Sequence, residues 1–196
     1  MFQVRIHGRG GQGVVTAAEM LSIAAFLEGR HAQAFPSFGS ERTGAPVVAF
    51  CRIDDREIRL REPVLEPDAL IIQDPTLLHQ VDVFGGLARA GYVLINTSRT
   101  FDALGVGDFA RTLRADRLCT VPATELALKH VGRPLPNAAL LGGFAAVSGR
   151  VSLEAVAAAI RDKFKGEVAE GNVAAANAAY AHVRSEMRET SHAQAD

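Results

Sequence analysis

A glycine-rich segment near the N-terminus has the composition and spacing of a phosphate-binding turn. Residues 8–13 read Gly-Arg-Gly-Gly-Gln-Gly, so that Gly8, Gly10 and Gly13 satisfy the pattern G-x-G-x-x-G. Such glycines let the backbone approach a phosphate, while the start of the following helix supplies N–H groups and positive potential. The charged and amide side chains between the glycines add further donors. The candidates for this chemistry are Gly8, Arg9, Gly10, Gly11, Gln12 and Gly13.

The same glycines also fit a tight strand-to-helix turn that needs them for steric reasons alone, and both interpretations stay open. A dinucleotide-binding turn requires, in addition, an acidic residue about 20 positions further on, at the end of the second strand. Residues 30–35 contain no carboxylate, Glu28 comes too early, and Glu41 lies beyond Pro36 and Gly39. The sequence therefore disfavours a free-standing NAD-dependent enzyme.

Two further polar groups outside the glycine segment have residue types suited to ligand binding. Arg42 offers a two-pronged donor for a phosphate or carboxylate, and Glu41 is placed to orient it. An intramolecular ion pair that stabilises the loop 35–46 explains the same two residues, and this interpretation is favoured over ligand binding. Asn137 follows Pro136 at the start of an apolar helix, where it either caps that helix or reaches into a neighbouring site. Capping is the favoured role, because Asn is a preferred capping residue.

The elements that would position these residues alternate as they do in α/β proteins. Residues 2–7 alternate apolar and polar side chains before the glycine segment, and residues 14–27 follow with helical spacing. A short strand is expected at 31–35. Short apolar runs predict buried parallel strands at 69–73, 92–96 and 118–121. Residues 47–52 and 56–60 are predicted to pair as an antiparallel hairpin joined at 53–55.

Helical segments separate these strands and dominate the last third of the chain. The helices are expected at 81–90, 123–130, 136–147, 152–164 and 168–187. Ser152 is suited to cap the helix that follows it. The fold class predicted is α/β, with three layers, a mostly parallel sheet with an antiparallel hairpin, and a helical C-terminal third. No linker separates two parts, so residues 1–196 are expected to form a single domain.

Composition excludes several classes of partner. Lys and Arg number 21 against 22 Asp and Glu, so the chain has no global charge that would attract nucleic acid or an anionic membrane. No apolar run approaches the ~18 residues of a membrane span, and the N-terminus lacks a signal-peptide layout. Cys51 and Cys119 are too few for a disulfide framework or an iron–sulfur cluster, which fits a reducing cytoplasm. The six histidines show no metal-ligand spacing, and no catalytic residue is predicted.

Several segments taken together resemble a known family. They are 7–13, then 32–36, then 41–47, followed by Gly-Arg-Pro-Leu-Pro-Asn at 132–137 with Leu141-Gly142. In this order and spacing they closely resemble the gamma subunit of 2-oxoacid:ferredoxin oxidoreductases of the pyruvate synthase type. The helical end of the chain, through Asn172 and Tyr180, is similar to the C-terminal pattern of that family. Family members often have a basic residue where this chain has Thr43.

The resemblance implies an auxiliary subunit, inactive alone, of an enzyme that oxidatively decarboxylates a 2-oxoacid to acyl-coenzyme A. In that family thiamine diphosphate with magnesium lies between the alpha and beta subunits, and [4Fe-4S] clusters lie on a delta-type subunit. Electrons pass to ferredoxin or another acceptor. The gamma chain is implied to be structural and to face coenzyme A, with pyruvate as the default 2-oxoacid. We expect its partner-facing apolar surface to include Phe35, Phe38 and residues 140–144.

Three other functions stay open at this stage. The beta subunit of indolepyruvate oxidoreductases has a similar glycine segment, although it usually has a Gln-Arg-Gly-Gly type sequence where this chain has Glu41-Arg42-Thr43-Gly44. A stand-alone nucleotide-binding dehydrogenase and a non-enzymatic scaffold are the remaining alternatives.

Overall fold

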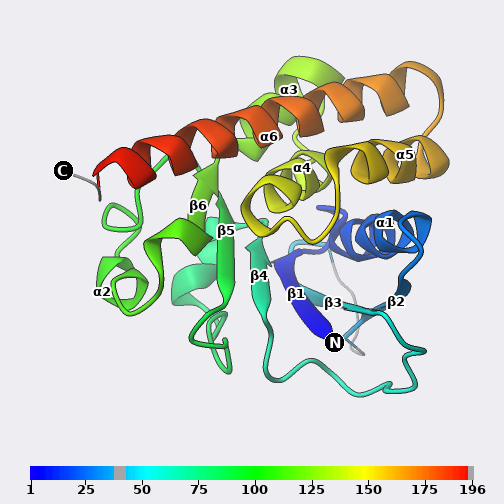
Figure 1. The fold of residues 1–196 in the computed structure, drawn as a ribbon. Helices are drawn as coiled ribbons and strands as arrows, with labels where there is room; N and C mark the ends of the chain where they lie inside the picture. The colour runs from blue at the N-terminus through cyan, green and yellow to red at the C-terminus, as the bar shows by residue number, and fades with distance from the viewer. Residues whose placement is uncertain (38–42, 194–196) are drawn as a thin grey trace.

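The chain folds around a mixed sheet of six strands, seen edge-on in the computed structural model (Figure 1). The structure describes residues 1–37 and 43–193. The strands are β1 Phe2–Arg9, β2 His31–Pro36, β3 Pro46–Asp54, β4 Ala69–Ile72, β5 Tyr92–Asn96 and β6 Leu118–Val121. Their order across the sheet is β2-β3-β1-β4-β5-β6.

Parallel and antiparallel strands meet at β1. On one side β1 pairs in parallel with β4, which pairs in parallel with β5, and β5 with β6. On the other side β1 pairs antiparallel with β3, whose far edge pairs antiparallel with β2. The strand β4 is buried on both faces, as expected of a parallel strand in the middle of a layered sheet.

The long helices all lie on one face of the sheet (Figure 1). The helices within the described residues are α1 Val14–Leu27, α2 Gly107–Ala110, α3 Ala123–Val131, α4 Asn137–Ser148, α5 Leu153–Lys163 and α6 Gly166–Ala193, with short 3-10 turns η1 Pro75–His79 and η2 Ala115–Arg117. The helix α4 lies against the sheet, and α6 crosses over it. No helix in the described part of the chain is both long and apolar enough to cross a membrane.

The core lies between the sheet and α4, which is buried on every side up to Val147. A Cβ atom at Gly142 would lie 2.0 Å from the backbone oxygen of Ala176 on α6, so the two helices touch backbone to backbone. The next residue, Gly143, lies against side-chain atoms of Leu94 on β5 and of Val183 on α6. The two adjacent glycines thus allow α4 to pack closely on both α6 and the sheet.

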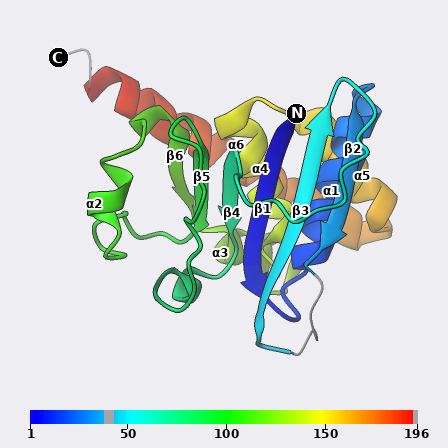
Figure 2. The same ribbon diagram turned by 90° about the horizontal axis from the view of Figure 1, so that it is seen from below.

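A thinner layer covers the other face of the sheet. Beneath β4 and β5 a second apolar cluster is built from Ile72, Leu77, Val83, Ile95 and their neighbours. Beneath β1 and β3 the irregular segment 55–68 crosses the strands (Figure 2). The helical layer, the sheet and this thinner layer confirm the predicted α/β architecture and its helical C-terminal part.

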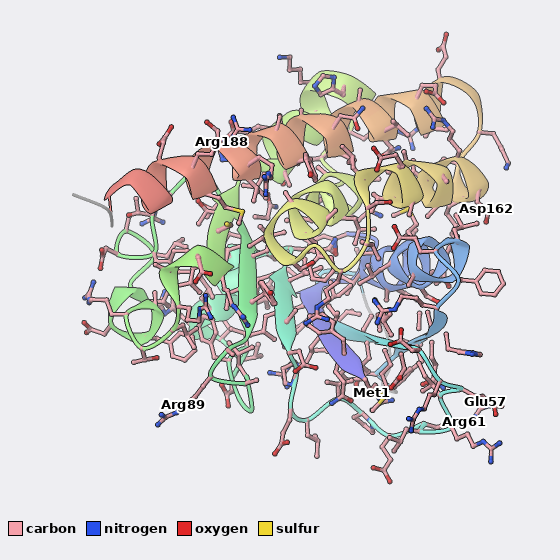
Figure 3. The ribbon with its side chains drawn as sticks, viewed as in Figure 1. Met1, Glu57, Arg61, Arg89, Asp162 and Arg188 are labelled. Atoms are coloured by element: carbon pink, nitrogen blue, oxygen red, sulfur yellow. The ribbon has the colours of Figure 1, made fainter. Side chains whose placement is uncertain are left out.

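The predicted hairpin between 47–52 and 56–60 is wrong in its second strand. Residues 56–60 form no strand, because both edges of β3 are already occupied by β1 and β2. The segment 55–68 is instead fixed by buried arginines. Arg52 donates to the carbonyl of Glu62 at 2.5 Å, and Arg5 donates to that of Val64 at 3.4 Å. Side chains such as Glu57 and Arg61 extend away from the sheet (Figure 3).

The helix predicted at 81–90 is also absent. Asp82 accepts a hydrogen bond from the N–H of Gly85 at 2.9 Å, and Gly86 has a φ of +73°. Two consecutive glycines, of which Gly86 has a positive φ, favour a turn over a helix. The other predicted helices and strands are confirmed, with the last helix longer at both ends than expected.

Candidate functional site

The loops that follow the parallel strands meet at one edge of the sheet and enclose an open groove of about 520 Å³. We call it the carboxyl-edge groove. Its polar lining consists of Gln12, Thr43, Gln73, Asp74, Asn96 and Thr124. Its other walls consist of Gly10, Gly11, Pro75, Pro134, Leu135 and Pro136. Open α/β sheets place ligands in the crevice outside the carboxyl ends of their strands, and the groove occupies that position.

The segments that support the family resemblance converge at this groove. The N–H of Gly10 donates to the carbonyl of Ala45 at 2.9 Å, and the N–H of Gly44 donates back to Gly10 at 3.0 Å. Asn137, at the start of α4, contacts Gly13 at the start of α1. Three segments distant in the sequence are thus joined at one place.

Different structural constraints explain why glycine occupies the individual positions of segment 8–13. A Cβ atom at Gly8 would lie 2.6 Å from Cγ2 of Val14, and one at Gly13 would lie 2.5 Å from Nδ2 of Asn137. Gly11 and Gly13 also have φ angles of +93° and +72°. The steric explanation of these glycines therefore applies at Gly8 and Gly13, while Gly11 has no atom within 4 Å of its Cβ position and borders the groove.

Backbone donors near the groove are available. The N–H groups of Gly11 and Gly13 meet no acceptor within residues 1–37 and 43–193. The helix α1 starts without a side-chain cap and without an acidic residue in its first turn. Such a helix start has free N–H groups and a positive partial charge, so it favours a ligand that accepts hydrogen bonds.

Arg9 is occupied by this chain's own groups. Its Nε donates to Oδ2 of Asp74 at 3.1 Å, and its Nη1 donates to the carbonyl of Gly44 at 3.0 Å. Its Nη2 donates to Thr76 at 2.8 Å and to Gln80 at 2.7 Å. The guanidinium therefore holds the glycine segment to the loop after β4, and its charge is paired with a carboxylate.

Gln12 and Asp74 complete this network. The Gln12 side chain accepts from the N–H of Arg9 at 2.8 Å and donates to Oδ2 of Asp74 at 2.9 Å, so it holds its own turn. Burial acts to raise the pKa of Asp74, but hydrogen bonds from Thr76 and Gln12 and the charge of Arg9 outweigh it. The pKa of Asp74 therefore lies below its ordinary value, and the carboxylate stays ionised.

Asn137 joins two helix starts rather than capping one. It is the first residue of α4, and Pro136 occupies the capping position. Its Nδ2 donates to the carbonyl of Gly13 at 3.4 Å, and its Oδ1 accepts from the N–H of Ala138 at 2.9 Å. Only 4% of its surface is exposed. The predicted capping role is thus replaced by a contact with the glycine segment.

Gln73 is a site residue that the sequence did not reveal. It follows β4 directly, is 1% exposed, and lies in the lining of the carboxyl-edge groove. Within residues 1–37 and 43–193, both of its side-chain polar atoms, Oε1 and Nε2, are without a hydrogen-bond partner. A buried polar atom without a partner costs about 1–3 kcal/mol, so this amide is unusual. The signal in the sequence was a polar residue directly after an apolar strand.

The neighbouring amide of Asn96 is fully used. Its Nδ2 donates to the carbonyl of Gln73 at 2.8 Å and to Oγ1 of Thr124 at 2.8 Å, while its Oδ1 accepts from the N–H of Thr124 at 3.1 Å. Asn96 thus ties β4 to the start of α3 and fixes the backbone of Gln73.

The groove lacks the features of a dinucleotide site. The strand β3 lies between β1 and β2, so the end of β2 is not adjacent to the glycine segment. The segment 31–36 also has no acidic residue for a ribose. These observations agree with the sequence in disfavouring a stand-alone dehydrogenase.

The described residues contain neither an activated thiol nor a cluster of side chains suited to a metal ion. Burial raises the pKa of Cys51 to about 12, and burial with the charge of Glu186 raises that of Cys119 to about 12. Both cysteines are therefore neutral thiols in the folded chain. No group of three His, Cys, Asp or Glu side chains that could hold a metal ion occurs within residues 1–37 and 43–193.

The remaining predictions concern the loop with Glu41 and Arg42 and the apolar surface expected to face partner chains. Glu41, Arg42 and Phe38 lie outside the described residues. Residues 140–144 were expected to face partner chains, and that expectation is wrong: they are buried between the sheet and α6. Phe35 is half-buried against Phe50, with ring centroids 5.1 Å apart.

The six-stranded mixed sheet with helices on one face and an open polar groove at its carboxyl edge places the chain in the α/β class, whose members commonly bind ligands at that edge. The chain belongs to the pyruvate ferredoxin/flavodoxin oxidoreductase family, which it matches over residues 3–182. It is an oxidoreductase subunit of the gamma type, as the resemblance implied.

Individual relatives match almost from end to end. The chain is 49% identical over 180 residues to pyruvate synthase subunit PorC of Methanocaldococcus jannaschii, covering 92% of this chain and 96% of the relative. It is 46% identical over 180 residues to the pyruvate/ketoisovalerate oxidoreductases common subunit gamma of Pyrococcus abyssi, with the same coverage of 92% and 96%. The crystal structure of pyruvate oxidoreductase subunit PORC of Thermotoga maritima superposes with a TM-score of 0.77 at 38% identity, covering 91% of this chain and 94% of that one.

Proposed function

We propose that this chain is the gamma subunit of a thiamine-diphosphate-dependent complex that oxidatively decarboxylates a 2-oxoacid to acyl-coenzyme A. The observation that supports it most is the similarity over 92% of the chain to subunits named for pyruvate and ketoisovalerate oxidoreductases. Pyruvate is the substrate we propose by default. We place the complex in the cytoplasm, where the two free cysteines would remain reduced.

The proposed partners are alpha and beta subunits, which hold thiamine diphosphate and magnesium, and a delta-type subunit, which holds [4Fe-4S] clusters. Thiamine diphosphate supplies the electron sink for the loss of carbon dioxide, and ferredoxin or another acceptor takes the electrons. The residues of this chain are suited to binding rather than to these steps, since its two thiols are buried and neutral. We propose that residues 1–196 act as one domain in that complex.

Within the complex, we assign the carboxyl-edge groove to coenzyme A. Free N–H groups at Gly11 and Gly13 and the uncapped start of α1 support this assignment. Arg9 and Gln12 keep the glycine segment in the shape that presents these donors. Arg42, together with Glu41, is assigned to coenzyme A phosphates on its residue type alone. The residues proposed for this site are Gly8, Arg9, Gly10, Gly11, Gln12, Gly13, Glu41, Arg42 and Asn137.

The subunit role is tested by purifying the chain from its native cell at low salt and identifying co-purifying proteins by mass spectrometry. Recovery of a thiamine-binding pair and a cluster-bearing subunit is the expected result, and their identities would narrow the substrate and acceptor. Recovery of the chain alone, or only as copies of itself, would contradict the proposal.

A further inference from the structure

We infer that the amide of Gln73 binds an amide of the pantetheine arm of coenzyme A in the carboxyl-edge groove. The inference rests on the proposed function and specifies which part of coenzyme A lies against Gln73. It starts from the one polar side chain in the described lining of the groove that is both buried and without any partner.

The other amides of the groove have their partners within the chain. Gln12 uses both ends of its amide on Arg9 and Asp74. Asn96 uses its amide on the carbonyl of Gln73 and on Thr124. Gln73 is held in place through its backbone, with its N–H donating to the carbonyl of His7 at 2.7 Å, while its side chain has neither donor nor acceptor opposite it. The backbone of Gln73 is therefore held in place, while its buried amide has no partner among the described residues.

The bonding capacity of this amide identifies the matching chemistry. Its oxygen needs a donor and its nitrogen needs an acceptor, side by side. An ionised phosphate provides acceptors only, so it would leave the oxygen of Gln73 unpaired. An amide provides both groups, and the pantetheine arm contains two amides separated by methylene groups.

The charged and apolar residues that line the groove also favour a pantetheine arm beside Gln73. In its described lining the charged side chain is Asp74, whose carboxylate is paired with Arg9 at 3.1 Å. The described side chains next to Gln73 therefore supply no free cation, and the phosphates of coenzyme A are left to the N–H groups of Gly11 and Gly13 at the start of α1. Pro75, Pro134 and Leu135 line the walls and offer apolar contacts to methylene groups.

The test is a Gln73→Met variant, which keeps the size of the side chain and removes the amide. In the assembled complex we expect its KM for coenzyme A to rise about ten-fold, as expected for two lost hydrogen bonds. The inhibition constant of pantetheine should rise by the same factor, and that of 3′,5′-ADP should not change. Gln33→Met is the matched control. The buried Oε1 of Gln33 also has no partner among the described residues, but Gln33 lies on β2 outside the groove. The substitution should therefore leave all three constants unchanged.

A second measurement separates binding from a structural role. In the full chain without partners, Gln73→Met should raise the thermal midpoint by a few degrees, because it removes a buried amide that lacks partners. A lower midpoint would overturn the inference, since it would mean that Gln73 is bonded within the fold.

The remaining outcomes are also decisive. An unchanged KM for coenzyme A, or a rise for 3′,5′-ADP but not for pantetheine, would overturn the inference while leaving the subunit role intact. A loss of complex yield without a change in KM would overturn it in favour of a partner segment as the occupant. Failure of the proposed function itself would appear earlier, as a chain that does not purify with its partners.

Discussion

At the scale of single residues, the sheet contains a buried imidazole next to a buried guanidinium. Arg5 donates through Nε to Nε2 of His7 at 3.0 Å, and His7 is 4% exposed. Burial first, and then the charge of Arg5, lower the pKa of His7 to about 4, against an opposing effect of Asp82. The ring is therefore neutral in the folded chain near neutral pH.

This environment predicts a pH dependence of stability. Between the ordinary pKa of 6.5 and the folded value of about 4, the unfolded chain binds a proton at His7 that the folded chain does not. The free energy of unfolding should therefore fall as the pH falls through this range, by up to about 3 kcal/mol. Urea unfolding of wild type and His7→Gln at several pH values measures it, and the variant should show a smaller slope.

The exposed His31 on β2 provides the control, because His31→Gln leaves the buried ring in place. The comparison of slopes does not depend on how much His7→Gln changes the stability itself. Equal slopes for wild type and His7→Gln would show that burial does not hold this ring neutral.

The chemistry of individual residues was only partly predictable from their types. Gln12 and Arg9 lie in one turn, as the sequence predicts, but their partner Asp74 is 62 or more positions away. The local sequence therefore could not show that both side chains bond to Asp74 rather than to a ligand. The same limit applies to Gln73. Whether a buried amide is free depends on where the neighbouring amides find their partners, and that is fixed only by tertiary structure.

At the scale of elements, the contact between α4 and α6 yields a sharp prediction. A Cβ atom at Gly142 would meet the backbone oxygen of Ala176 at 2.0 Å, and a backbone atom of a packed helix cannot move away freely. Gly142→Ala should therefore lower the free energy of unfolding by about 2 kcal/mol or more. Chemical denaturation of the purified chain measures this change.

The adjacent glycine is a matched control. At Gly143 the nearest atoms are side-chain atoms, Cδ2 of Leu94 at 3.3 Å and Cγ2 of Val183 at 3.4 Å, which can shift slightly. Alanine also favours a helix over glycine by about 1 kcal/mol. Gly143→Ala should thus stay within about 1 kcal/mol of wild type. Equal losses for the two variants would contradict the backbone contact at Gly142.

Elements were predictable where a local pattern decides them. The bounds of α1 and β6 follow from helical spacing and a short apolar run, and Ser152 caps α5 by accepting from the N–H of Ala155 at 3.1 Å, as expected. The partner of β3 was not predictable in this way. The segment 56–60 has the alternation of a strand, but β1 and β2 already occupy both edges of β3, and that competition is not local.

At the scale of the whole molecule, the segments that revealed the family resemblance in the sequence come together in the fold. Residues 8–13, 43–45 and 137 are far apart in the sequence, yet hydrogen bonds join them at one edge of the sheet. The expected partner-facing surface at 140–144 was wrong, because an apolar stretch does not reveal whether its own chain covers it. Here α6 does so.

We expect this chain to complete a 2-oxoacid oxidoreductase without performing its redox chemistry. The most direct measurement is reduction of an artificial electron acceptor by the purified complex, with pyruvate and coenzyme A, before and after removal of this subunit and after adding it back. We expect coenzyme A-dependent turnover to be lost on removal and restored on addition, while the chain alone shows none. Undiminished turnover without the subunit, or turnover by the chain alone, would contradict it.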